Sequence, residues 1–211
     1  MKKFILFTLV ALAAGTVQSQ MIVQANKVTL QPQVGRDAHG YDTCGIRAVV
    51  IAERPDGFDG YDFSINVYNG AMEGMMKAGK TTVSTAEILK GHAVPQAVKP
   101  GPVNFWVAEE AESKPLSLLK KGKADNPAYI IGTSELGATL KAIMAVAKGE
   151  RMQFVVRYKS QPLDTVVAFN SALKEEEMKP LMACFSGLIK RMESDLEFDS
   201  FSTVVTPAKS R

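Results

Sequence analysis

The sequence predicts an α+β fold: an antiparallel, β-rich sheet or sandwich with two packed amphipathic helices near the C-terminus. Two patterns predict it. Apolar and polar residues alternate in several short segments, as in strands that bury one face. Two later segments repeat apolar residues every three or four positions, as amphipathic helices do. Residues 1–25 have the pattern of a removable export signal, which leaves residues 26–211 as a single domain.

The N-terminal segment has the three parts of a secretory signal peptide. Lys2 and Lys3 supply positive charge, and the apolar run 4–15 is too short for a permanent membrane helix, which needs about 20 residues. Small residues then place the cleavage site after Ser19 or after Ala25. We therefore expect a periplasmic or secreted protein with no transmembrane anchor after cleavage.

The only cysteines of the chain are Cys44 and Cys184. An even number of cysteines in an oxidising compartment favours a structural disulfide between them. The formal charge of +3 includes two lysines of the signal peptide, and no dense Lys/Arg run follows. We therefore expect no binding to nucleic acid.

The first two strands are expected at 46–53 and 61–68. Between them lies a turn rich in Pro and Gly, so the two strands should form a β-hairpin with one buried face. That face would carry Tyr61, Phe63, Ile65 and Val67. Further strands are expected at 103–108, 128–131, 151–158 and 163–169.

The first amphipathic helix is expected to begin after a cap at Thr133 or Ser134. Its apolar stripe runs from Leu136 to Ala147, and Gly149 would end it as a C-terminal cap. This spacing predicts a helix that buries one side.

The second helix is expected to begin near Lys179, with Pro180 in its first turn, where a missing N–H costs nothing. Its apolar stripe includes Leu181, Phe185 and Leu188. The tail at 194–211 is expected to be partly flexible, with a short strand near 201–205.

One segment matches the phosphate-loop pattern G-x-x-x-x-G-K-[ST] through Gly74, Gly79, Lys80 and Thr81. Such a loop would hold phosphates with backbone N–H groups and Lys80, and magnesium with Thr81. The match does not directly follow a buried strand, and bulky methionines fill it. We interpret it as a fortuitous match in a surface loop, and we predict no cofactor.

Two polar clusters raise the question of a metal site. One contains Asp37, His39, Asp42 and Cys44, and the other contains Asp56, Asp59 and Asp62. The spacing of the first is not that of a recognised site, and Cys44 is expected in the disulfide. The second lacks the closing acidic ligand of a calcium loop. We interpret both as turns and predict no metal.

The absence of a convincing nucleophile–base pair favours a non-enzymatic binding or accessory module of the envelope or of a secretion apparatus. Its partner would be another envelope or extracellular protein, and Met72, Met75 and Met76 could contribute to a contact surface. The alternative is an envelope hydrolase that uses Ser134 with His39 or His92. Ser134 follows a glycine on a strand-to-helix turn, although the second glycine of the G-x-S-x-G pattern is displaced by one position.

Overall fold

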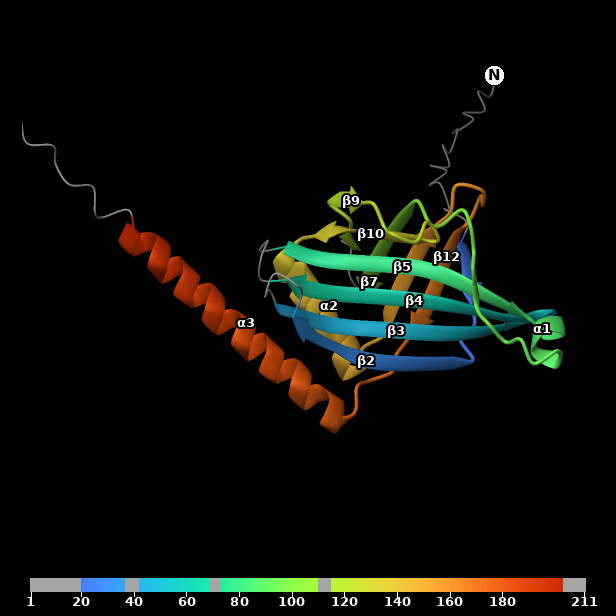
Figure 1. The fold of residues 1–211 in the computed structure, drawn as a ribbon, viewed down its shortest axis with the longest axis horizontal. Coiled ribbons are helices and arrows are strands. Elements are labelled where there is room, and N and C mark those ends of the chain that lie inside the picture. The colour runs from blue at the N-terminus through green and yellow to red at the C-terminus, as the bar shows by residue number, and fades with distance from the viewer. Residues whose placement is uncertain (1–19, 37–41, 69–72, 110–114, 203–211) are drawn as a thin grey trace, which may run out of the picture.

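The computed structural model describes residues 20–36, 42–68, 73–109 and 115–202, with side chains as far as Arg191. These residues form two β-sheets and three helices (Figure 1). The expected α+β fold, rich in antiparallel sheet, is confirmed. No helix in the part of the chain that the structure describes is long and apolar enough to cross a membrane.

The seven-stranded sheet is built around three long antiparallel strands, β3 (Asp42–Arg54), β4 (Gly57–Tyr68) and β5 (Glu73–Ser84). Its strand order is β2-β3-β4-β5-β10-β9, and the short β6 also pairs with β5. The remaining strands are β2 (Lys27–Arg36), β6 (Gln96–Ala97), β9 (Lys120–Gly122) and β10 (Tyr129–Ser134). The predicted hairpin is confirmed, and its four expected inward side chains are at most 2% exposed.

The five-stranded sheet has the order β1-β12-β11-β7-β8. Its strands are β1 (Gln20–Val23), β7 (Asn104–Glu109), β8 (Leu116–Ser117), β11 (Met152–Arg157) and β12 (Asp164–Phe169). β1 pairs with β12 in parallel, whereas the other neighbours are antiparallel. Because β1 ends at Val23, cleavage after Ala25 would remove this strand.

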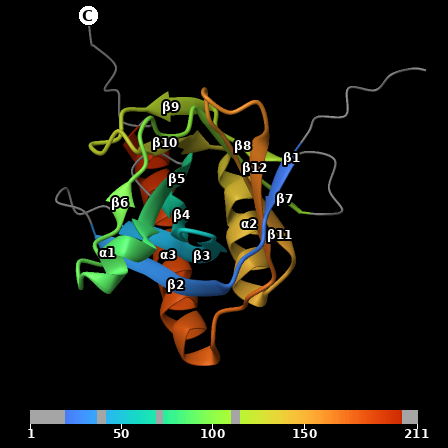
Figure 2. The same cartoon turned by 90° about the vertical axis from the view of Figure 1, so that its right-hand side faces the viewer.

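Helix α2 (Leu136–Lys148) lies between the two sheets and contacts β3, β4, β5 and β8 (Figure 2). Away from this helix the sheets meet directly, because Phe63 of β4 stacks with Phe105 of β7 and contacts Phe154 of β11. The finer expectation of a sandwich with two packed helices is not confirmed. One helix instead separates two sheets that touch through aromatic rings.

Helix α3 (Glu175–Ser202) contacts β2 and β3 through its first half, and its second half extends beyond the sheets (Figure 1). Leu181, Phe185 and Leu188 are buried, as the expected apolar stripe requires. The disulfide between Cys44 and Cys184 is confirmed, and it links α3 to the beginning of β3.

Both helix starts differ from the sequence-based expectation. The cap of α2 is Glu135, whose carboxylate accepts hydrogen bonds from the N–H groups of Gly137 and Ala138, so the cap predicted at Thr133 or Ser134 is wrong. The predicted end at Gly149 is confirmed by its left-handed conformation, with φ of 80°. Helix α3 begins at Glu175 instead of Lys179, since acidic residues fill its first turn and favour an earlier start.

The tail and the middle of the chain also differ from the sequence-based expectation. Residues 201 and 202 belong to α3, so the predicted strand at 201–205 is wrong where the structure describes it. The segment 74–81, expected as a surface loop, lies within β5. Helix α1 (Thr85–Leu89) follows β5 directly, and the Ser84 hydroxyl caps it by accepting a hydrogen bond from the N–H of Glu87.

Candidate binding face

The phosphate-loop match lies inside a strand that pairs with β4 on one side and β10 on the other. Its backbone N–H groups therefore point to the neighbouring strands on either side, and they cannot converge on one phosphate. Each glycine makes room for a neighbouring side chain. A Cβ atom at Gly74 would overlap Thr139 Oγ1, and one at Gly79 would overlap the ring of Tyr129.

Lys80 points to the inner side of the seven-stranded sheet, where its Nζ lies 2.7 Å from a carboxylate oxygen of Asp59. Both side chains are mostly buried, at 15% and 12% exposure. The Lys80 ammonium also lies 5.3 Å from the ring centre of Tyr61. Burial raises the pKa of Tyr61 and of Tyr158, and the nearby Asp59 carboxylate raises both further. Lys80 is thus a partner of a buried carboxylate.

Replacing Lys80 with Met is expected to lower the free energy of unfolding by about 2 kcal/mol, because the Asp59 carboxylate loses its closest cation in a mostly buried position. Chemical denaturation measures the loss. Adding Asp59→Asn to the Lys80→Met variant should restore part of it, since the buried carboxylate that lost its closest cation is then removed. An unchanged stability for Lys80→Met would contradict this role.

Ser134 and His92 lie at opposite ends of β5. Ser134 is opposite Gly74, is fully buried, and shares a 2.8 Å hydrogen bond with Thr139. His92 follows α1 beyond the other end of the strand and is exposed. The part of β5 from Gly74 to Ser84 is roughly 30 Å long. The structure therefore does not bring His92 to Ser134. His39 lies outside the described residues.

The acidic residues of the two clusters that the structure describes have cationic partners. Asp42 pairs with Arg36 and Arg191, Asp56 with Arg54, Asp59 with Lys80 and Arg54, and Asp62 with Arg47. Among the described residues, no group of three His, Cys, Asp or Glu side chains is arranged to hold a metal. Asp37 and His39 lie outside these residues.

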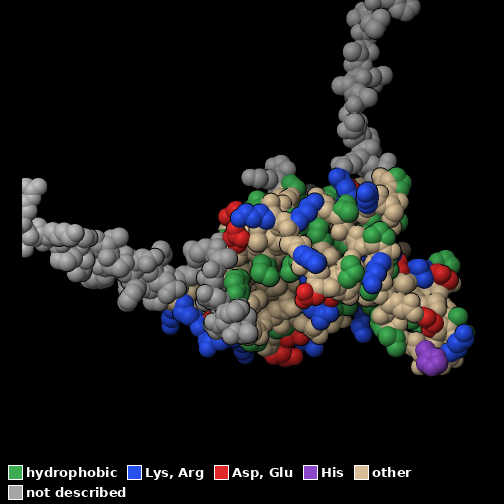
Figure 3. Space-filling view, turned by 45° about the horizontal axis from the view of Figure 1, so that its top comes forward, with side chains coloured by type: hydrophobic (Ala, Val, Ile, Leu, Met, Phe, Trp, Pro, Cys, Tyr) green, Lys and Arg blue, Asp and Glu red, His purple; other side chains and the backbone are tan. Residues whose placement is uncertain are grey.

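The strand register instead brings polar and apolar side chains together on the outer side of the seven-stranded sheet, over β5, β10 and β9. Ile131 stands opposite Lys77, and Thr133 stands between Met75 and Lys120. We call this surface the lysine face. It consists of Met75, Lys77, Lys120, Lys123, Tyr129, Ile131 and Thr133. Lys and Arg side chains lie among hydrophobic ones, with a few Asp or Glu side chains, on the face shown in Figure 3.

Two adjoining hollows open on the lysine face. The larger, about 390 Å³, is lined by Lys77, Tyr129 and the segment 123–126, together with Arg47 and Asp62. The smaller, about 340 Å³, is lined by Met75, residues 120–123 and residues 131–133. Lys123 and Ile131 line both, so the hollows lie side by side, and we refer to the two together as the depression.

Tyr129 lines the larger hollow. Its ring lies over Gly79, and the Lys77 ammonium sits 4.3 Å from the ring centre. Its hydroxyl donates to Asp62, which also accepts two hydrogen bonds from Arg47 at 2.8 and 2.9 Å. Burial raises the pKa of Tyr129, and the Asp62 carboxylate adds to the shift. The phenol therefore stays neutral at physiological pH and supports a cation on its ring face.

No family model, curated protein or solved structure matches this chain. Function is therefore inferred from geometry and charge. The lysine face combines a concave shape, an aromatic ring, apolar side chains and cationic groups, a mixture typical of ligand and protein contacts.

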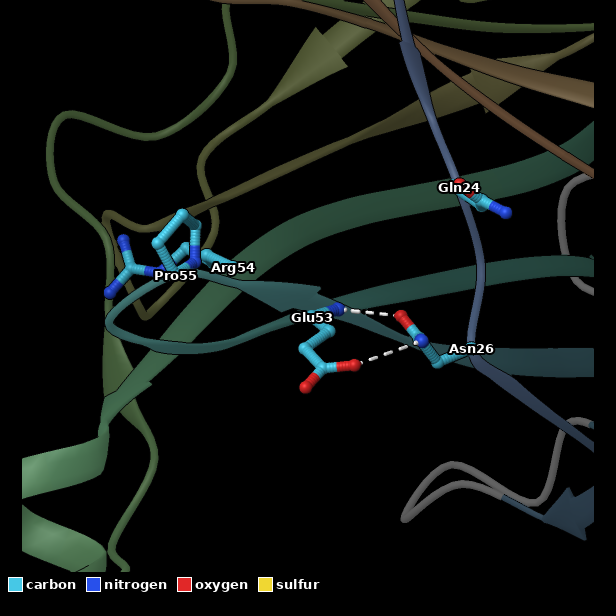
Figure 4. Close-up of a pocket in the computed structure, with 5 residues that line it drawn as sticks. All are labelled: Gln24, Asn26, Glu53, Arg54 and Pro55. Atoms are coloured by element: carbon cyan, nitrogen blue, oxygen red, sulfur yellow. Dashed lines mark hydrogen bonds between the residues drawn. The ribbon is translucent and has the colours of Figure 1, made fainter.

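Another hollow, of about 420 Å³, lies at the end of the β3–β4 hairpin and is lined by Gln24, Asn26, Glu53, Arg54 and Pro55 (Figure 4). The Asn26 side chain accepts a 2.6 Å hydrogen bond from the N–H of Glu53 and donates to its carboxylate at 3.4 Å. These bonds attach the segment after β1 to the hairpin.

Proposed function

We propose that this chain is an exported, non-enzymatic binding module of a bacterial envelope or secretion apparatus, and that it binds a partner protein through the lysine face. The observation that carries the proposal is the pair of adjoining hollows, both lined by Lys123 and Ile131, on the outer side of the sheet. The disulfide agrees with an oxidising compartment. The envelope hydrolase is less well supported, because Ser134 is buried and bonded to Thr139.

The binding role is tested by placing a photo-crosslinking amino acid at position 131 in cells that produce the full chain. We expect a discrete crosslinked partner at this position. Position 89 serves as the matched control, because Leu89 is an apolar residue, 83% exposed, on the distant helix α1. The same product from both positions, or none from position 131, would contradict binding at the lysine face.

The export role predicts a specific mature N-terminus, which we infer to be Gln20. Cleavage after Ala25 would remove β1, whose residues pair with Asp164–Val167 of β12, and would leave that buried strand without its neighbour. It would also remove Val23 and Ala25, which pack against the core. Intact-mass measurement of the natural product is expected to give a chain that begins at Gln20. A chain that begins at Asn26, or one that retains Met1, would contradict this prediction.

A further inference from the structure

We propose that the lysine face recognises an acidic peptide segment of its partner, with carboxylates placed at Lys77 and Lys123 and an apolar side chain placed against Ile131. This inference rests on the proposed binding function and specifies the chemistry of the partner. It follows from the charges of the depression, from the way its cations are held, and from its apolar lining.

The depression carries an excess of positive charge. The residues that line its two hollows include five Lys or Arg side chains and two Asp side chains. One of the two carboxylates, Asp62, already accepts two hydrogen bonds from Arg47. An incoming carboxylate therefore meets a surface on which cations outnumber carboxylates.

Two of these cations have no carboxylate partner among the described residues. The Lys77 ammonium is held over the ring of Tyr129, and no ion pair of Lys123 is present in this part of the chain. The other two lysines differ: Lys120 lies 3.7 Å from Glu73, and Lys121 donates to the carbonyl of Val103. Lys77 and Lys123 are therefore the lysines that a carboxylate can engage without breaking an ion pair or a hydrogen bond seen among the described residues.

The ring of Tyr129 restricts where the Lys77 ammonium lies. A cation held on an aromatic face loses less conformational freedom when it binds an anion than a freely rotating lysine does. The Tyr129 ring packs over Gly79 of the neighbouring strand β5, which limits the positions that the ring can take. The cation is thus partly positioned before the partner arrives.

The apolar lining favours a peptide over an anionic polysaccharide. Met75 and Ile131 line the smaller hollow, directly beside the lysines. A peptide can place an apolar side chain there while its carboxylates reach Lys77 and Lys123. A sulfated or uronic sugar chain offers charge but few apolar groups, so it would leave this lining in contact with polar atoms.

The test measures binding of the purified mature chain, with its disulfide intact, to three fluorescent probes. These are a random copolymer of Glu and Tyr, poly-glutamate, and dextran sulfate. We expect the copolymer to bind most tightly, with an affinity that falls as salt is added. Replacing Lys77 and Lys123 together with Gln should raise the Kd for the copolymer about 5- to 30-fold.

The matched control replaces Lys90 and Lys159 with Gln. Both are exposed and lie outside the lysine face, so this variant loses the same charge without changing the depression. An equal loss of affinity in both variants would show non-specific attraction and overturn the proposal. Tighter binding of dextran sulfate would replace the peptide with a polysaccharide and also overturn it.

The same variants separate this inference from the proposed function. A partner crosslinked at position 131 that binds the Lys77→Gln/Lys123→Gln variant with unchanged affinity would overturn the acidic-peptide inference and leave the binding function intact. Absence of any partner at position 131, with copolymer binding that depends on Lys77 and Lys123, would instead contradict the proposed function.

Discussion

Removal of the disulfide is expected to lower the free energy of unfolding by about 4–5 kcal/mol. Cys44 and Cys184 are 140 positions apart, so the bond closes a long loop and strongly restricts the unfolded chain. In the folded chain the bond also holds α3 against β2 and β3, where Leu181 and Phe185 are buried. The Cys44→Ala/Cys184→Ala variant, measured by urea unfolding, should show this loss.

Reduction of the wild-type protein provides the control for this prediction. The reduced protein should match the double alanine variant, and reductant should not change the stability of that variant. Protease should also cleave the variant more readily near residues 170–174, which connect β12 to α3. Equal stability of the oxidised and reduced proteins would show that packing of α3 alone holds the helix in place.

The strands were predictable because their signal is local. In 61–68 and in 152–158, every second residue is apolar, and these side chains point into the core in the structure. The apolar periodicity of α2 also predicted a helix with a buried side, but it could not show that this helix lies between two sheets, where Thr139, Ala142 and Val146 are buried as well. A helical pattern indicates which side is buried, and the identity of the neighbour depends on residues far away in the sequence.

The errors at helix starts have a related cause. Ser134 fits the usual preference for an N-terminal cap, yet β10 extends through it, and the next residue, Glu135, provides the cap. Pro180 indicated a helix start, but α3 had already begun at Glu175. A residue that is favourable at a helix start does not prove a start when a neighbouring residue can serve the same purpose.

The lysine face could not be predicted from the sequence. Lys77 and Tyr129 are far apart in the chain, and only the antiparallel register of β5 and β10 places them on the same side of the sheet. In β5, Met75 and Lys77 alternate with buried residues, and this alternation was the available signal for a strand. A loop, as predicted at 74–81, has no such alternation. The phosphate-loop match implies that Gly79 makes room for a phosphate. In the structure, Gly79 makes room for the ring of Tyr129.

Replacing Phe63 with Ala is expected to lower the free energy of unfolding by about 3–5 kcal/mol, as for other fully buried aromatic residues. Phe63 is 0% exposed. Its ring centre lies 5.6 Å from that of Phe105 and 4.9 Å from that of Phe154, both in the opposite sheet. The substitution leaves a cavity where the sheets meet, and long strands on both sides limit how far the structure can close it. Urea denaturation measures the loss.

The control is Phe58→Ala in the same strand. Phe58 is 38% exposed and lies near the turn, so its replacement should cost less than about 1 kcal/mol. Comparing the two separates loss of contact between the sheets from a general loss of aromatic residues in β4. If the two substitutions cost the same, Phe63 does not join the sheets, and the stability of the molecule must come mainly from α2 and the disulfide. If only Phe63→Ala is costly, direct aromatic contact holds the sheets together where α2 does not separate them.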